Sequence, residues 1–193
     1  IDQCPIATEK INQVLPLARK NLAERRLGLK KGGTLLLRDT NGHITTDPNE
    51  LVQERVGDLT FQFRAGDFFQ NNPSILPELV NYVIKQSQPQ KTSFLIDAYC
   101  GSGLFGISAS PHFKKVIGIE ISREGFHGAQ ANAKLNRMVN AEFILGDAFS
   151  IFDAIDSTFQ PCTLLVDPPR RGCDQNFLSQ ALSFSPDFIV YIS

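Results

Sequence analysis

The sequence lacks tryptophan, contains a single methionine and has only four cysteines in 193 residues. The cysteines, at positions 4, 100, 162 and 173, are not spaced in the pairs that hold zinc, so we expect no metal site and a reducing compartment. No apolar run reaches the roughly 20 residues that span a bilayer, and the first ten residues carry no apolar signal core. We therefore expect an intracellular protein without a membrane segment.

Charge and composition are close to balanced. Nineteen Lys and Arg against 20 Asp and Glu give a formal net charge of -1, which argues against non-specific coating of nucleic acid but leaves room for a local basic face. The chain is 42% hydrophobic, so it can bury a core. We expect a monomer with one main domain and a small additional segment.

The first 67 residues have a mixed pattern that predicts a small α+β segment. Apolar residues recur at helical spacing over 7–27, which predicts an amphipathic helix. The basic residues near its end fit either an RNA contact or simple complementation of the helix dipole. Strands are expected in two hairpins, at 34–37 and 44–46 around Asn41-Gly42 and at 51–56 and 59–63 around Gly57-Asp58.

From residue 68 to residue 193 a second pattern follows, in which strands and helices alternate. Such alternation predicts an open parallel α/β sheet of the Rossmann-like kind, with helices on both faces and ligands beyond the carboxyl ends of the strands. A helix is expected first, at 75–84, with Ser74 as its N-cap. The expected strands are 93–99, 116–121, 142–145, 163–166 and 188–192, and the expected helices are 104–113, 123–136 and 175–184.

The first strand of this sheet leads into a tight glycine turn, Gly101-Ser102-Gly103, where glycine lets the backbone pass close to a ligand. Four successive strands end in acidic residues, which are Asp97, Glu120, Asp147 and Asp167. Glu120 suits the two hydroxyls of a ribose, a role that a nicotinamide cofactor would share. A carboxylate just before the turn would repel a pyrophosphate, whereas Asp97 and Asp147 suit the ammonium group and the adenine amine of S-adenosylmethionine. Acids at strand ends also cap helices, so that alternative stays open.

Two further segments indicate a base-binding site. The segment FFQNNP at 68–73 places two aromatic rings and three amides before a helix; these suit a stacked base and a polar ligand, although core packing and capping explain them equally well. In LLVDPPRRG at 164–172, two prolines after Asp167 keep the loop extended. Methyltransferases that act on exocyclic amines carry an aromatic after the prolines. This chain has Arg170 there, which points away from amine methylation.

These strings together resemble the catalytic domain of the S-adenosylmethionine-dependent RNA uracil-5-methyltransferases, and are most similar to the fungal tRNA enzymes that make 5-methyluridine in the T loop. The resemblance covers nearly the whole chain, through QCPIATEKIN, FRAGDFFQNNP, LIDAYCGSGLFG, VIGIEIS, AQANAKLN, FILGDAF and LLVDPPRRG to IVYIS. It implies a class I methyltransferase fold, S-adenosylmethionine as cofactor and tRNA as partner. It implies cofactor contacts for Gln70, Tyr99, Gly101, Gly103, Glu120, Asp147 and Asp167, and substrate contacts for Phe68 and Arg170.

The resemblance also implies a mechanism. In that family a cysteine thiolate adds to C6 of uracil, which gives C5 enolate character for attack on the methyl group, and a base then removes the C5 proton. The nucleophile and the base are expected after Ser193, together with the last two of seven strands. None of the four cysteines present is a good substitute, so we expect this chain by itself to bind cofactor weakly and to be inactive, with an unpaired strand edge at 188–192. An amine methyltransferase of the same fold and a catalytically silent tRNA-binding module are the alternatives.

Overall fold

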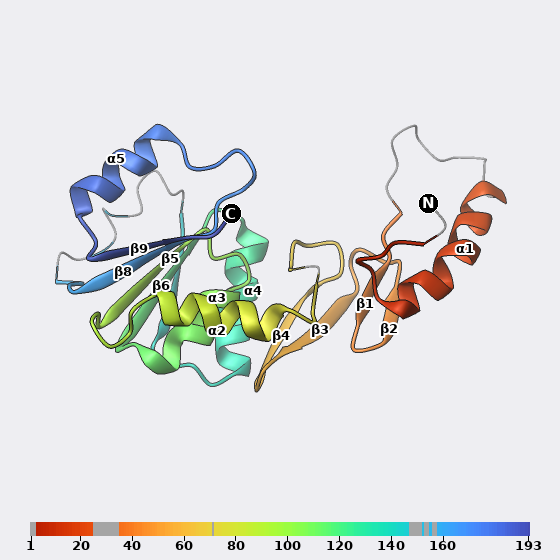
Figure 1. The fold of residues 1–193 in the computed structure, drawn as a ribbon, viewed down its shortest axis with the longest axis horizontal. Coiled ribbons are helices and arrows are strands. Elements are labelled where there is room, and N and C mark those ends of the chain that lie inside the picture. Colours follow the sequence, from red (N-terminus) through yellow and green to blue (C-terminus); the bar gives the residue numbers. More distant parts are fainter. Residues whose placement is uncertain (1–2, 25–34, 71, 147–151, 153–154, 156–157) are drawn as a thin grey trace.

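The computed structural model describes residues 3–24, 35–70, 72–146, 152, 155 and 158–193. In this part of the chain, a helix and two hairpins extend from one end of a parallel α/β sheet (Figure 1). The elements in chain order are α1 (Glu9–Glu24), β1 (Arg38–Thr40), β2 (His43–Thr45), β3 (Leu51–Val56), β4 (Leu59–Arg64), α2 (Leu76–Gln86), β5 (Phe94–Ala98), α3 (Leu104–Ala109), the 3-10 turn η1 (Ser110–His112), β6 (Lys115–Glu120), α4 (Arg123–Leu135), β7 (Ala141–Leu145), β8 (Cys162–Val166), α5 (Gln175–Phe184) and β9 (Phe188–Tyr191).

The large sheet has five parallel strands in the order β7-β6-β5-β8-β9. The chain starts at β5 in the middle, builds outward through β6 and β7, and then returns to the other side of β5 with β8 and β9. This reversal creates a switch point at the carboxyl end of β5, where ligands bind in such sheets. Every residue of β8 is buried, as is expected of a strand that helices cover on both faces. The predicted Rossmann-like fold is confirmed.

Two hydrophobic clusters pack on the two faces of this sheet. Leu95, Val116 and Leu165 point to the face that α2 and α3 cover, while their strand neighbours point to the face that α5 covers. The β3–β4 hairpin contributes to the first cluster with Val52, Val56, Phe61 and Phe63. This hairpin therefore shares a core with the α/β sheet. A domain boundary after residue 67, as expected from the sequence, stays a prediction.

The two hairpins form at the expected turns. Asn41 (φ 53°) and Gly42 (φ 84°) make the two-residue turn of β1–β2, because Asn-Gly tolerates two left-handed conformations in succession. The first strand was predicted at 34–37, but β1 is Arg38–Thr40 and shares no residue with that range, because β2 ends at Thr45, which pairs with Arg38, and residues 35–37 have no strand opposite them. Residue 34 lies outside the described residues. In the second hairpin Leu51 pairs with Arg64 and Val56 pairs with Leu59, so the strand predicted at 51–56 is confirmed and the one predicted at 59–63 is one residue longer.

Three helices differ from the predictions in their ends. The helix predicted over 7–27 begins at Glu9, and its described part ends at Glu24, with none of its residues buried. The predicted N-cap Ser74 is wrong: its Oγ donates to Asn72 Oδ1 at 2.7 Å, and Ile75 holds the cap position without a side-chain bond. The helix predicted over 104–113 ends at Ala109 and continues as a 3-10 turn, because Pro111 lacks the N–H that another α-turn would use.

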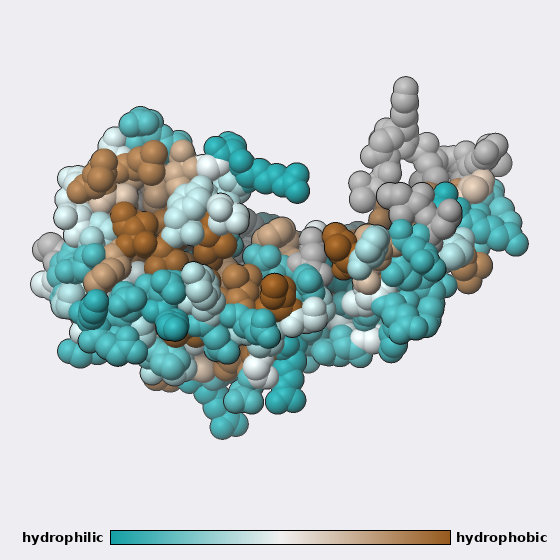
Figure 2. Space-filling view, viewed as in Figure 1, coloured by the Kyte–Doolittle hydropathy of each residue, from teal (hydrophilic) through white to brown (hydrophobic). Residues whose placement is uncertain are grey.

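Strand β9 pairs only with β8 among the described residues, so its outer edge is open. Ile189 and Tyr191 on this strand are 56% and 54% exposed, and Leu182 on the neighbouring α5 is 78% exposed. Apolar residues gather on this side of the molecule in Figure 2. None of the described helices combines the length and the apolar character that crossing a membrane requires.

Candidate active site

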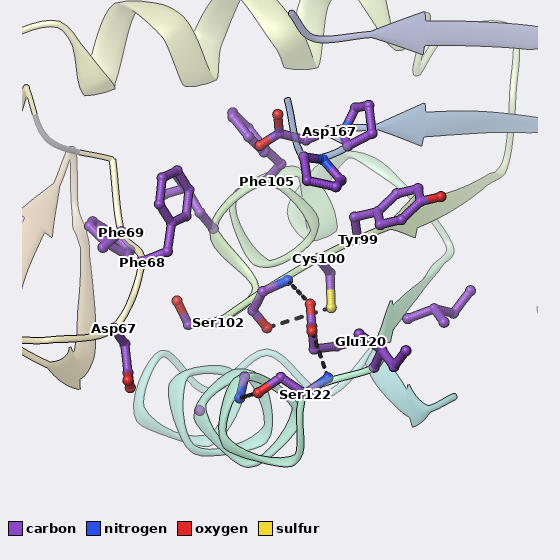
Figure 3. Close-up of a pocket in the computed structure, with 18 of the residues that line it drawn as sticks. Asp67, Phe68, Phe69, Tyr99, Cys100, Ser102, Phe105, Glu120, Ser122 and Asp167 are labelled. Carbon is purple, nitrogen blue, oxygen red and sulfur yellow. Dashed lines mark hydrogen bonds between the residues drawn. The ribbon is translucent and has the colours of Figure 1, made fainter. Parts of the chain in front are cut away.

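A cleft of about 960 Å³ opens at the carboxyl ends of β5, β6 and β8. Its floor is the glycine turn after β5, and its walls are the end of β4 with the segment 67–70, the start of α4, and the loop 167–174 after β8. Figure 2 shows the surface hollowed between the N-terminal hairpins and the sheet, and Figure 3 shows side chains of this cleft. The cleft therefore lies at the switch point that the fold predicts.

The glycine turn brings three left-handed residues into five positions. Tyr99, Gly101 and Gly103 have φ angles of 63°, 55° and 86°. A Cβ at Gly101 would meet nothing within 4 Å, so the backbone there faces open space, whereas a Cβ at Gly103 would lie 2.7 Å from Ile107 Cδ1. Tyr99 adopts a conformation that is costly for a bulky residue, and such strain is concentrated at functional sites. The turn thus presents bare backbone to the cleft.

Glu120 is held rigidly at the end of β6. One carboxylate oxygen accepts the Gly101 N–H at 2.8 Å, and the other accepts the Ser122 N–H at 2.8 Å (Figure 3). A Cβ at Gly125, on α4, would lie 2.9 Å from Glu120 Cγ, so glycine there makes room for this side chain. Each carboxylate oxygen can accept a second hydrogen bond, so Glu120 can still receive two hydroxyl groups.

Asp97 lies beneath the turn and not in the cleft wall, in contrast to the expected contact with a ligand's ammonium group. Its Oδ2 accepts the Gly106 N–H of α3 at 2.8 Å, while its Oδ1 has no hydrogen-bond partner among the described residues. Burial is the main cause that raises the pKa of Asp97 from 3.8 to about 7; the Gly106 N–H opposes the rise, and the charges of Asp167 and Glu120 add to it. Asp97 therefore connects β5 to α3.

The loop after β8 forms the wall opposite Glu120. Asp167 is half-buried, and its burial raises the pKa of its carboxyl group. The two prolines that follow lead into a turn in which the Gly172 N–H donates to the Pro169 carbonyl at 2.7 Å, with Gly172 at φ 76°. Arg170 and Arg171 are exposed and line the mouth of the cleft. The loop thus presents one acid inside the cleft and two cations at its rim.

The segment 67–70 divides its two aromatic rings between core and cleft. Phe69 is buried and stacks on Phe63 of β4, with ring centroids 4.2 Å apart and an angle of 9° between the planes. Phe68 is 77% exposed and lines the cleft. The core interpretation therefore holds for Phe69, and Phe68 is free to contact a ligand.

Arg38 of β1 supports this segment, a role that the sequence did not suggest. Its guanidinium donates to the Ala65 carbonyl at 2.9 Å and to the Asp67 carbonyl at 3.1 Å, and lies 5.3 Å from the Phe63 ring centroid. No local signal marks Arg38, because its partners are 27 and 29 residues away.

Two asparagines that the sequence analysis did not single out also support the site: Asn132 of α4 and Asn136, the C-cap residue of that helix. Asn132 bonds Gln62 of β4 and Ser102 of the glycine turn, and Asn136 bonds Thr60 of β4. The spacing of four residues in the string AQANAKLN puts both on one helix face, which was the available signal.

The cysteines have the character of packing residues. Cys100 and Cys162 are buried, and burial raises the pKa of the Cys100 thiol well above its ordinary value and that of Cys162 to about 11. Cys173 is partly exposed at the cleft; burial raises its pKa, and a hydrogen bond with Tyr99 opposes the rise. Activated cysteines have lowered pKa values, so these three are poor nucleophiles. Within the described residues, no three His, Cys, Asp or Glu side chains are grouped to hold a metal.

The structure brings most of the predicted site residues into this one cleft. Those that line it are Gln70, Tyr99, Gly101, Glu120, Asp167, Phe68 and Arg170. Gly103 lies in the turn that forms the floor. Asp147 lies outside the described residues. The contacts of each residue with a cofactor or a substrate stay predictions.

The chain is similar to known enzymes along its full length. It is 43% identical to the tRNA (uracil(54)-C(5))-methyltransferase of Schizosaccharomyces pombe and 38% identical to that of Saccharomyces cerevisiae, with all of this chain aligned. It covers 39% and 37% of those proteins, so it spans about two fifths of their length. The crystal structure of the Pyrococcus abyssi tRNA (uracil-54, C5)-methyltransferase in complex with S-adenosyl-L-homocysteine matches with a TM-score of 0.62 and 26% identity, over 77% of this chain and 35% of that one.

A sequence model of one family, described as tRNA (Uracil-5-)-methyltransferase, matches residues 17–193. The match includes the glycine turn, the anchored Glu120 and the Asp167 loop, which together form the cleft. The chain belongs to the tRNA (uracil-5-)-methyltransferase family.

Proposed function

We propose that this chain forms the cofactor-binding part of an enzyme that transfers a methyl group from S-adenosylmethionine to C5 of a uridine in tRNA, giving 5-methyluridine in the T loop. The observation that carries the proposal is the anchored Glu120 beside the exposed backbone of the glycine turn. The proposal also rests on the family and on the names of the similar enzymes. A tRNA substrate places the activity inside the cell; a monomeric state stays a prediction.

The residues of the cleft fit S-adenosylmethionine, which when bound supplies an electrophilic methyl group on a positively charged sulfur. Glu120 has free acceptor positions for two ribose hydroxyls, and the open space above Gly101 admits a ligand against the backbone. Asp167, half-buried in the opposite wall, supplies a negative charge that favours a cationic ligand. Gln70 and Tyr99 complete the proposed cofactor contacts.

Phe68 and Arg170 are the proposed substrate contacts. Phe68 is exposed at the cleft wall and directly precedes Phe69, which is fixed in the core by its stack on Phe63; the Phe68 ring therefore offers a flat surface on which a uracil base can stack. Arg170 at the rim can contact a phosphate of the RNA, and such contacts position a nucleic acid without reading its sequence. Burial raises the pKa of Cys100, Cys162 and Cys173, which does not favour any of these three as the nucleophile of the covalent step. The cysteine and the base expected after Ser193 stay a prediction.

Calorimetric titration of S-adenosylhomocysteine into this chain tests the cofactor site. We expect Glu120→Gln to weaken binding about tenfold, because a charged acceptor is replaced by an amide in a partly buried site. Glu78→Gln, on the exposed surface of α2, is the matched control and should bind as the unaltered chain does. A folded chain that does not bind, or a Glu120→Gln variant with unchanged affinity, would contradict the proposal.

The reaction itself is tested with the protein that carries this chain. It is incubated with S-adenosylmethionine and tRNA that lacks 5-methyluridine, and the nucleosides are then analysed by mass spectrometry. We expect 5-methyluridine in the T loop. A methylated exocyclic amine would instead support the amine methyltransferase, and no product with tight tRNA binding would support the silent binding module.

A further inference from the structure

Asn132 of α4 connects two parts of the cleft wall that are far apart in the sequence. The residue is completely buried. Its amide nitrogen donates to the Ser102 carbonyl of the glycine turn at 3.0 Å and to the Gln62 carbonyl of β4 at 3.1 Å, and its Oδ1 accepts the Gln62 N–H at 2.7 Å. Ser102 and Gln62 both line the cleft. A single amide therefore joins the floor of the cleft to the hairpin beside it.

The hydrogen bonds of Asn132 leave no freedom in its orientation. Both amide hydrogens have an acceptor, and the oxygen has a donor. A flipped amide would put its oxygen against the carbonyls of Gln62 and Ser102 and its nitrogen against the Gln62 N–H, so the network assigns one arrangement. Alanine, leucine or aspartate at this position would leave at least two partly buried backbone groups of Gln62 and Ser102 without this partner, which is costly.

Asn136, the C-cap residue that directly follows α4, makes the same kind of contact with β4 but does not bond the turn. Its Oδ1 accepts the Thr60 N–H at 2.9 Å, and its nitrogen donates to the Thr60 carbonyl at 2.8 Å. Four residues of helix rise about 6 Å and two residues of strand about 6.8 Å, so the two asparagines match alternate residues of β4. Together they cover the edge of β4 that does not pair with β3. Because only Asn132 also bonds the glycine turn, a comparison of the two residues distinguishes the effect of the hairpin contact from that of the turn contact.

The β3–β4 hairpin also supports the aromatic residue proposed for the base. Phe63 follows Gln62 directly and stacks on Phe69, which precedes Gln70 and follows the exposed Phe68. Displacement of Gln62 therefore displaces the surface on which Phe69 rests. A continuous series of contacts thus connects the Ser102 carbonyl with Phe68. It consists of the Asn132 amide, the backbone of β4 from Gln62 to Phe63, the stack of Phe63 on Phe69, and the peptide bond between Phe69 and Phe68.

We propose that Asn132 is a positioning residue that couples occupation of the cofactor turn to the placement of Phe68. The inference rests on the proposed function, since it requires the cofactor in this cleft. A ligand on the turn restrains Ser102, and through Asn132 it restrains β4. By thermodynamic linkage, the factor by which the cofactor favours the ordered hairpin equals the factor by which the ordered hairpin increases the affinity for the cofactor. The chain thus binds the RNA base best when the cofactor is present.

The test compares Asn132→Ala with Asn136→Ala by calorimetry with S-adenosylhomocysteine and by hydrogen exchange. Both variants lose a hairpin contact, and only Asn132→Ala loses the contact with Ser102. We expect Asn132→Ala to bind S-adenosylhomocysteine about tenfold more weakly and Asn136→Ala to bind within about twofold of the unaltered chain. In the unaltered chain, the ligand should slow exchange of the Gln62 amide more than that of amides in the β1–β2 hairpin.

Each outcome decides the proposal. Equal affinity in Asn132→Ala and the unaltered chain would overturn it, as would equal losses in both variants, which would indicate general loosening of the hairpin. If Asn132→Ala does not fold, the exchange experiment on the unaltered chain decides: uniform slowing of all amides would overturn the coupling. Failure of the unaltered, folded chain to bind S-adenosylhomocysteine would contradict the proposed function itself and not this inference alone.

Discussion

Asp97 should make this chain less stable as the pH rises from about 4 to about 7. Its pKa is raised from 3.8 in an ordinary environment to about 7 in the folded chain, chiefly by burial. Between these values the unfolded chain has lost the proton and the folded chain still holds it. The folded state binds more protons, so the free energy of unfolding falls with rising pH by up to about 1.36 kcal/mol per pH unit.

The magnitude follows from the width of this interval. About three pH units give a loss of roughly 4 kcal/mol, complete once the pH exceeds the folded pKa. Asp97 as a whole residue is 1% exposed, so little of this is screened by water. Asp97→Asn has no proton to lose and keeps an oxygen to accept the Gly106 N–H. Its stability should lack this dependence on pH.

Urea unfolding of the unaltered chain and of Asp97→Asn at several pH values from about 4.5 to about 7.5 measures the difference. The gap between the two free energies of unfolding should change by about 3 kcal/mol over that range, in favour of the variant at high pH. Asp58→Asn, which makes the same substitution at a fully exposed position, is the control. Parallel curves for Asp97→Asn and the unaltered chain would refute the reasoning.

Three further predictions concern packing, capping and thiol chemistry. Gly106→Ala should lower the free energy of unfolding by about 1–3 kcal/mol in chemical denaturation, because its Cβ would lie 2.9 Å from Asp97 Oδ2; no loss would mean that α3 can shift. Asp174→Ala should cost about 1 kcal/mol, since Asp174 caps α5 by accepting the Asn176 and Phe177 N–H groups, and an unchanged melting temperature would argue against this cap. In the folded chain, a thiol reagent should modify Cys173 before Cys100, as mass spectrometry of the labelled peptides can determine; rapid labelling of Cys100 would contradict its burial.

The features that the sequence predicted correctly depend on neighbouring residues. Asn41-Gly42 determines its turn locally, because few residue pairs tolerate two left-handed conformations. The strands of the parallel sheet are short apolar runs with acids or turns at their ends, and the alternation with helices leaves few other arrangements. Since the carboxyl ends of such strands meet at one edge, the cleft and most of its lining could be anticipated.

The features that were missed depend on contacts between distant residues. Asn132 meets Gln62 across 70 positions, and the spacing of Asn132 and Asn136 places them on one helix face without indicating which strand they meet. Asp97 was expected to face the ligand, but a strand pattern cannot distinguish an acid in the cleft wall from one that turns under α3 to meet Gly106. Ser74 is a good N-cap by type, yet Asn72 competes for its hydroxyl group.

The position of β5 in the middle of the sheet has a consequence for the order in which the chain folds. β5 pairs with β6 across one short helix, as Phe94 with Lys115, but its other neighbour is β8, where Phe94 pairs with Cys162. Closing the longer loop costs more chain entropy, so the β5–α3–β6 unit should assemble first and β8 should join it late. Asp167 follows β8 directly, so the wall of the cleft that the loop 167–174 forms should be added only late in folding.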